Sequence, residues 1–282
     1  MASNVDFQEE TEEEAMKLAT VLGSVVPDEM FLLRAACYVE SCDPRTQEPI
    51  PAVPFGIAYD LPKGYCKPKQ LTQLWEMVDG TKVKHPLNER FELARQISTA
   101  VLFIHSVGWF HKGIRSSNIW LAQKDSSGRC FPQCLGTAFL AGLDYSRRGQ
   151  ATSTGDETGE SWRRTIYQHP ERASEAEASD CTAAPYRAEY DIYSLGVVLV
   201  ELGRWKPVTS YDTMFKNVQA AKRKTNLESL ADSLAITLGQ RYVDVTLQCL
   251  RVLDSTSSSH ISLGSPIRHA VLELEHLAAA TR

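Results

Sequence analysis

The sequence has no apolar run that approaches the roughly 18 residues needed by a membrane-spanning helix. Its first residues, MASNVDFQEETEEEAMK, are acidic where a signal peptide would be basic and then apolar. A net charge of -5 and a pI near 5.8 also leave no positive field of the kind that draws proteins to nucleic acid or anionic membranes. We therefore expect an intracellular, cytoplasmic protein with neither nucleic acid nor membrane as a partner.

The sequence also lacks a cysteine framework, because its seven cysteines are odd in number and scattered. That pattern is typical of buried thiols in a reducing compartment. Cys130 and Cys134 are closely spaced, but no second pair and no histidine completes a zinc site with them, so we expect no metal. What is present is a 282-residue chain that is 43% hydrophobic, which is enough to fill the core of one large domain or two lobes.

The first part of the chain predicts one helix, two strands and a second helix. Residues 9–26 begin with acidic side chains and continue with apolar ones at helical spacing. Residues 31–40 and 53–61 are rich in apolar and aromatic side chains and flank a turn region, which indicates an antiparallel pair of strands. Residues 68–78 read as a short helix with proline at its start.

The rest of the chain is predicted to be mainly helical. Asn88 is expected to cap a long amphipathic helix that ends near Gly108. Two short apolar runs, residues 118–122 and 137–141, predict strands on either side of a polar loop. The segment DIYSLGVVLVELG, residues 191–203, is apolar on nearly every side, which predicts a helix in the centre of the fold.

One segment carries a resemblance to a known family. Residues 105–121, HSVGWFHKGIRSSNIWL, resemble the protein-kinase catalytic loop H-R-D-L-x-x-x-N, which also follows a long helix and precedes a short strand. The resemblance matches His111 to the motif His, Lys112 to its Arg, Gly113 to its Asp, Arg115 to the loop Lys and Asn118 to the metal-binding Asn.

Two later segments resemble kinase elements in the same order. IYQHPER resembles the A-P-E element, with Pro170 and Glu171 in register, and YDIYSLGVVLVEL resembles the buried helix whose Asp, here Asp191, steadies the catalytic loop. The resemblance implies a buried Asp191 that accepts hydrogen bonds from the backbone around His111 and Lys112. The sequences HKGIRSSNI, GLDYSR and YQHPER are similar to those of the degenerate kinase-like (pseudokinase) domains of filamentous-fungal proteins with HeLo/prion-inhibition-type architectures. The resemblance covers about residues 10–255 and is clearest over residues 88–205.

The residues that phosphoryl transfer needs are largely missing. Gly113 stands at the position of the catalytic Asp and has no side chain to accept a proton. Gly142 stands at the Asp of the metal-binding D-F-G, although a rival alignment reads Asp144, Tyr145 and Ser146 as that motif and would restore a metal carboxylate. No Gly-rich loop is present, and Glu14 is the expected match to the Glu that pairs with an absent strand lysine.

The remaining positions that match the family have either two possible roles or a structural one. Asn118 either holds a metal ion or bonds its own loop backbone, and Arg115 either meets a phosphate or braces the loop. We expect His111 to be a hydrogen-bonded core imidazole, since the carboxylate that it would serve is absent. Glu171 is read as structural, like Asp191, with Arg251 as its candidate partner. The hydroxyls and arginines of residues 146–165 form either a solvated loop or a segment phosphorylated by another kinase.

Together these observations predict an α+β, protein-kinase-like fold. Residues 1–62 would form a truncated N-terminal lobe, a helix plus a hairpin, on a mainly helical C-terminal lobe of residues 63–282. The expected function is that of a catalytically inactive pseudokinase that acts as a scaffold or regulatory module for protein partners and needs no cofactor. One alternative is a protein kinase or ATP-binding protein with residual activity that uses ATP and Mg²⁺ at Asn118 and Asp144. The other is a fragment of a larger fungal signalling protein.

Overall fold

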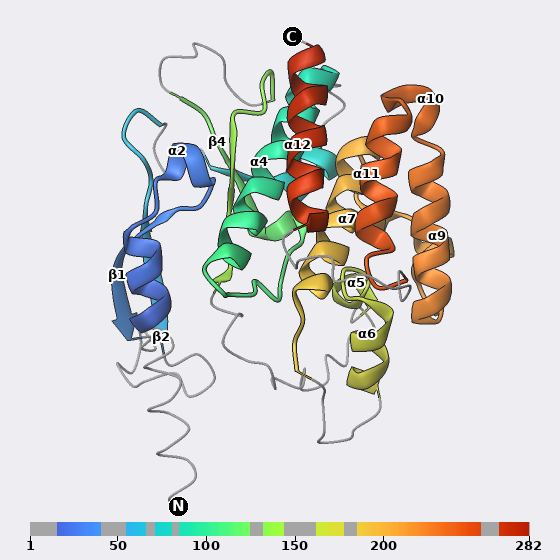
Figure 1. Cartoon of the computed structure of the whole chain (residues 1–282), viewed down its shortest axis with the longest axis horizontal. Helices are drawn as coiled ribbons and strands as arrows, with labels where there is room; N and C mark the ends of the chain where they lie inside the picture. Colours follow the sequence, from blue (N-terminus) through green and yellow to red (C-terminus); the bar gives the residue numbers. More distant parts are fainter. Residues whose placement is uncertain are drawn as a thin grey trace, which may run out of the picture.

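The computed structural model describes residues 16–40, 55–65, 71–80, 85–124, 132–143, 162–177, 185–254 and 265–281. It is a mixed α+β structure in which helices predominate and the strands form two small antiparallel sheets (Figure 1). Within the described ranges, no helix combines the length and the apolar character that crossing a membrane requires. The α+β class predicted from the sequence is therefore confirmed.

The N-terminal part contains a helix and a two-stranded sheet. Residues 16–23 are helical and bury Leu18 and Leu22, which confirms this portion of the predicted first helix. After the short α2 (Pro27–Met30), strands β1 (Arg34–Glu40) and β2 (Phe55–Asp60) pair antiparallel, as predicted from their apolar and aromatic residues on either side of a turn region. Figure 1 shows this blue region at one edge of the molecule.

A second sheet of order β3-β4-β5 lies next to the first and supports the candidate site. Strands β4 (Ile119–Ala122) and β5 (Thr137–Leu140) were both predicted, and they pair antiparallel. The helix predicted over residues 68–78 begins only at Leu74 (α3, Leu74–Gly80), because β3 (Thr72–Gln73) pairs with the open edge of β4. Backbone hydrogen bonds to a neighbouring strand outweigh the local helical pattern at these two residues. A backbone hydrogen bond of 3.0 Å from Leu140 N to Phe31 O joins the N-terminal part to β5.

Helix α4 (Leu87–Ser106) forms as predicted but starts before Asn88. The N-cap position is Pro86, whose extended backbone (ψ 156°) ends the preceding segment, and no side chain caps the helix. The prediction that Asn88 is the cap is therefore wrong, and Asn88 lies in the first turn. The negative charge of Glu89 in that turn is favourable at a helix N-terminus.

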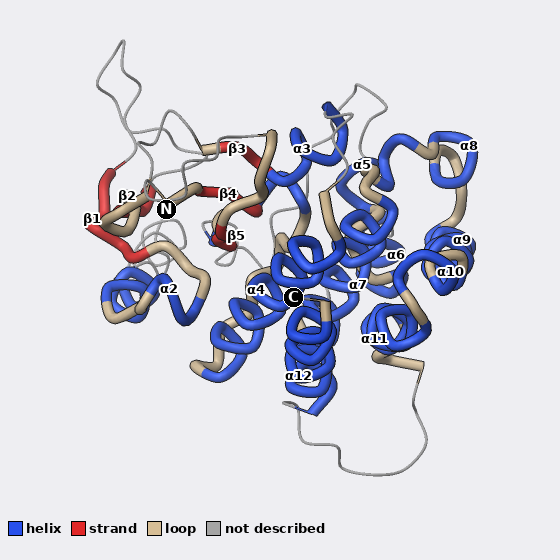
Figure 2. The backbone as a smooth tube through the Cα atoms, turned by 90° about the horizontal axis from the view of Figure 1, so that it is seen from above, coloured by secondary structure: helices blue, strands red, loops and turns tan. Residues whose placement is uncertain are grey.

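Helix α12 (Ser265–Ala280) packs along α4, as both Figure 1 and Figure 2 show. Its buried side chains recur every three or four residues and form one face that covers α4: Ile267, Ala270, Leu274 and Ala278. The sequence predicted this part of the chain to be helical but did not locate this helix, which completes the core on that side.

Helix α7 (Ala188–Arg204) is the centre of the helical part, as its apolar sequence predicts. Every residue from Tyr190 to Gly203 is buried. A Cβ at Gly203 would lie 2.5 Å from Leu234 Cδ1, so the glycine allows close helix packing there. The surrounding elements are α5 (Trp162–Thr165), α6 (Pro170–Glu177), η5 (Val208–Ser210), α8 (Asp212–Phe215), α9 (Ala220–Asp232), α10 (Ala235–Leu238) and α11 (Gln240–Leu250). The division into lobes at residue 62 stays a prediction.

Candidate functional site

The candidate site is the loop between α4 and β4, which is held by one buried carboxylate. The loop runs from Val107 to Arg115 and continues as the single turn η2 (Ser116–Asn118). Asp191, in the first turn of α7, is completely buried and faces this loop. Its Oδ2 accepts a hydrogen bond of 2.7 Å from the His111 N–H, and its Oδ1 accepts one of 2.9 Å from the Lys112 N–H. The burial of Asp191 and its two hydrogen bonds to the loop backbone were both predicted, and the structure contains them.

Two side chains that the sequence did not single out complete the bonding of Asp191. The Tyr186 hydroxyl donates to Oδ1 at 2.8 Å, and His105 Nε2 lies 3.1 Å from Oδ2. Burial acts to raise the pKa of Asp191, but the hydrogen bonds from His105 and Tyr186 and the nearby imidazoles outweigh it, so the pKa lies below its usual value. An ionised carboxylate can only accept, and His105 Nε2 must therefore carry the hydrogen of this contact.

Lys112 has an unusual backbone conformation, which is stabilised by the hydrogen bonds from the His111 and Lys112 N–H groups to Asp191. Its φ of 61° lies in the left-handed region, which costs a residue with a side chain about 1–2 kcal/mol. The Lys112 ammonium lies 5.5 Å from the centre of the Tyr186 ring, close enough for a cation–π interaction. Both the backbone and the side chain of Lys112 thus contact the group of residues around Asp191.

His111 is a core imidazole with both ring nitrogens hydrogen-bonded, as the sequence analysis expected. It is completely buried, and burial lowers its pKa, which favours the neutral ring. Nε2 lies 2.9 Å from the Ala141 carbonyl and donates to it, while Nδ1 accepts the Gly113 N–H at 3.2 Å. Neither nitrogen is available to move a proton, so the structure gives His111 a role in joining the loop to the end of β5.

The two glycines at the aligned carboxylate positions both lie beside Asn118. The Asn118 side-chain amide donates to the Gly113 carbonyl at 2.8 Å, which agrees with the reading that this Asn bonds its own loop. Gly142 has a φ of 83°, and a Cβ there would lie 2.8 Å from Asn118 Cγ and Nδ2. A side chain at residue 142 would therefore displace Asn118. Asp144, the metal carboxylate of the rival alignment, lies outside the described residues, and so does Glu14.

No protein-family model matches this sequence, and no curated protein matches it significantly. The arrangement around Asp191 must therefore be interpreted from its own geometry.

A second buried network joins η2 to α7, and the sequence analysis missed it. The Ser116 hydroxyl lies 3.2 Å from the Tyr167 hydroxyl, which donates to Glu201 Oε1 at 2.7 Å. The same oxygen accepts the Val208 N–H at 2.9 Å. Burial raises the pKa of Glu201 to about 7, although these hydrogen bonds act in the opposite direction. The signal that could have revealed it is a charged residue, Glu201, within a segment predicted to be buried on every side.

Arg115 lies partly buried between the two networks. Burial lowers the pKa of His111 and raises the pKa of Tyr167, and the positive charge of Arg115 acts more weakly to lower both. This position agrees with a residue that braces the loop from within.

Glu171 has different neighbours from the one expected. It accepts a hydrogen bond of 3.2 Å from the Tyr190 hydroxyl, and its carboxylate lies 3.9 Å from His169 Nδ1. The candidate partner Arg251 instead forms an ion pair of 2.9 Å with Glu228, because the end of α11 faces α9. The structural reading of Glu171 is supported by its contact with α7, but Arg251 is not involved.

The described part of the chain contains no group of three or more His, Cys, Asp or Glu side chains arranged to hold a metal ion. Cys130 lies outside it. Most of residues 146–165 also lie outside it, so phosphorylation of that window stays a prediction. Thr165 is described, and its hydroxyl donates to the Trp162 carbonyl at 3.2 Å and accepts from Arg223 at 2.9 Å. This one hydroxyl of the window is thus engaged in the fold.

Proposed function

We propose that the chain is a protein-kinase-like domain that acts as a scaffold or regulatory module and does not catalyse phosphoryl transfer. The observation that carries the proposal is the bonding of Asp191 to the backbone of His111 and Lys112, beside glycines at the two positions where the resemblance places carboxylates. The loop has the anchoring that the resemblance implies, but not the side chains that the reaction requires.

Phosphoryl transfer requires groups that this loop does not provide. A carboxylate has to orient the hydroxyl nucleophile, and metal ions have to bridge the phosphates. Gly113 provides no carboxylate, and the neighbouring His111 has both nitrogens engaged, so no general base is present on this part of the loop. At Gly142 the left-handed backbone and the contact with Asn118 oppose any side chain.

A scaffolding role agrees with the way in which the loop is held. Asp191 accepts four hydrogen bonds in a fully buried environment, where each unsatisfied donor would cost about 1–3 kcal/mol. Such bonding fixes the backbone independently of any substrate or nucleotide. A fixed loop without reactive groups is suited to presenting a surface of constant shape to a protein partner.

The test is the thermal unfolding of the purified chain with and without millimolar ATP and Mg²⁺. A ligand at about 100 times its dissociation constant adds about 2.7 kcal/mol to the free energy of unfolding, which would raise the midpoint by several degrees. We expect no shift. A rise that requires Mg²⁺ would overturn the proposal and favour residual ATP binding through Asn118 and Asp144. Incorporation of labelled phosphate into the chain or into a general protein acceptor would overturn it as well.

A further inference from the structure

A groove of about 550 Å³ runs along the outer face of α4, between α2 and α12. Leu102 and Phe103 of α4 form its floor, Met30 of α2 lies on one wall, and Val271 and Leu272 of α12 lie on the other. Figures 1 and 2 agree in placing α4 between the other two helices. The lining is mainly apolar, so the groove is suited to receive apolar side chains.

Leu272 stands at the edge of this groove and is 55% exposed. One exposed leucine is ordinary on a protein surface. Here, however, the exposed leucine adjoins an apolar groove on the same face of the molecule. A face that carries both an apolar side chain and a groove for one can pair with a copy of itself.

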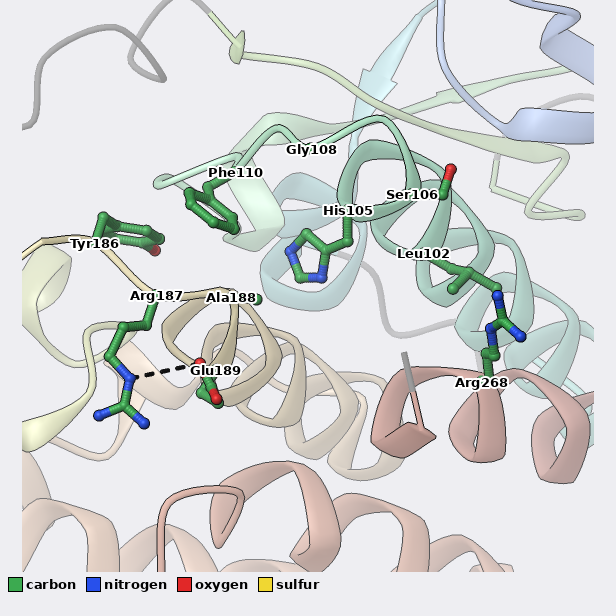
Figure 3. A pocket seen from close by; sticks show the side chains of 10 residues that line it. All are labelled: Leu102, His105, Ser106, Gly108, Phe110, Tyr186, Arg187, Ala188, Glu189 and Arg268. Carbon is green, nitrogen blue, oxygen red and sulfur yellow. Dashed lines mark ion pairs between the residues drawn. The ribbon is translucent and has the colours of Figure 1, made fainter. Parts of the chain in front are cut away.

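Leu272 lies between two exposed charges on the same strip of α12. Arg268 precedes it by four residues and Glu275 follows it by three, spacings that place all three side chains on one face of the helix. In Figure 3, Arg268 extends from α12 toward Leu102, at the boundary between the groove and a neighbouring pocket of about 490 Å³. Neither Arg268 nor Glu275 forms an ion pair or a side-chain hydrogen bond within the described ranges. Both charges are therefore available to a partner.

The other charged groups near this face have partners of their own or lie across the groove. The Arg95 guanidinium of α4 attracts the carboxylate on the strip, but it is bonded to Glu92 at 2.6 Å. Glu273 pairs with Arg241 of α11 at 2.7 Å, on the far side of α12. Glu29 is exposed on α2, at the opposite wall. The strip on α12 thus presents one positive and one negative charge on either side of an exposed leucine.

We propose that the groove binds helix α12 of a second copy of this chain, in a two-fold symmetric dimer in which Leu272 of each copy enters the groove of the other. The charges select the direction of the pairing. If the two copies of α12 ran parallel, each charge would face its own counterpart, and like charges would meet. In an antiparallel pair with Leu272 level with Val271 of the other copy, Glu275 is level with Arg268, and the symmetry repeats this ion pair. The proposal uses no residue around Asp191, so it goes beyond the proposed function and can fail independently of it.

Sedimentation velocity measures the self-association of the purified full chain. We expect the mass to rise from that of the 31.4 kDa monomer toward that of a dimer between about 1 µM and about 500 µM. The reason is that an interface of one helix and one groove per copy is small, which is typical of a weak, reversible association. A chain that remains monomeric at about 500 µM would overturn the proposal.

The apolar contact is tested with a matched pair of exposed residues. Leu272→Asp places a charge in the groove of the other copy and should weaken the association at least about 100-fold. Ile236→Asp, at a 95% exposed position of α10 outside the groove, should leave the association unchanged. Both variants should keep the urea midpoint of the unaltered chain, since both side chains face solvent. Equal association of the two variants would show that the interface lies elsewhere and would overturn the assignment.

The pairing direction is tested by charge reversal. Arg268→Glu and Glu275→Arg each turn two opposite-charge contacts into like-charge contacts and should each weaken the association about tenfold. A general effect of net charge would differ between them, because one makes the chain more negative and the other makes it less negative. The double variant restores both contacts with the charges exchanged and should associate within about threefold of the unaltered chain. If the double variant associates no better than the single variants, the antiparallel pairing is wrong.

Discussion

The two glycines beside Asn118 should respond in opposite ways to the addition of one methyl group. At Gly142 the left-handed backbone costs a residue with a side chain about 1–2 kcal/mol. The new Cβ would lie 2.8 Å from Asn118 Cγ, so Asn118 must move and lose its hydrogen bond to the Gly113 carbonyl, which is worth about 1 kcal/mol. We therefore expect Gly142→Ala to lower the free energy of unfolding by about 2–3 kcal/mol.

At Gly113 the corresponding Cβ would lie 3.4 Å from Asn118 Nδ2, which is an ordinary van der Waals contact. A glycine-to-alanine change at a permissive position stabilises a protein by about 0.4–1 kcal/mol, because it restricts the unfolded chain. Gly113→Ala should therefore be neutral or slightly stabilising. The pair is a matched comparison, since both changes add the same atoms beside the same side chain.

Urea unfolding followed by circular dichroism measures both effects as shifts in the midpoint at constant slope. Asn118→Ala combined with Gly142→Ala supplies the control, because removal of the Asn118 amide removes the clash and should recover about 1 kcal/mol relative to the sum of the single changes. If Gly142→Ala costs no more than Gly113→Ala, the reasoning from the close contact and the left-handed backbone is refuted.

Two further predictions concern the buried acids of α7. Asp191→Ala leaves four donors without their acceptor and should lower the free energy of unfolding by about 4 kcal/mol. The control is Asp232→Ala, at an exposed position of α9, which should change the free energy of unfolding by less than about 0.5 kcal/mol in the same urea experiment. Glu201, whose folded pKa is raised from 4.5 to about 7, takes up its proton more readily in the folded state, so stability should fall by about 3 kcal/mol as the pH rises from 4.5 to 7 and beyond. The Glu201→Gln variant should lack this part of the pH dependence. If the urea midpoint of the variant changes with pH as that of the unaltered chain does, the pH dependence does not come from Glu201.

The sequence could predict those elements in which the pattern of apolar residues directly indicates which residues are buried. The segment that became α7 is apolar on every side, and only a central helix buries such a surface. The two runs that became β4 and β5 are short, apolar and bounded by polar loops. The backbone contacts of Asp191 with His111 and Lys112 were also predicted, but on the basis of the resemblance alone.

What the sequence could not predict depends on partners that are distant along the chain. Thr72 and Gln73 continue a helical pattern, yet they form β3 because β4 offers an open edge there. Asn88 is a favourable capping residue, but Pro86 already sets the extended backbone that precedes α4. Tyr186 and His105 contact Asp191 from two different segments, and no local spacing identifies them. Contacts of this kind are determined by tertiary packing and not by periodicity.

The packing of α12 along α4 affects the order in which the protein can fold during synthesis. Helix α4 is complete once Ser106 has been made, but the face that α12 covers must wait for Ile267, Ala270, Leu274 and Ala278. Until then, the growing chain carries an uncovered apolar helix surface, the kind of surface that chaperones bind and that promotes aggregation. A ribosome-bound chain that stops at residue 254 should therefore bind chaperones, and one that extends well beyond residue 281 should release them.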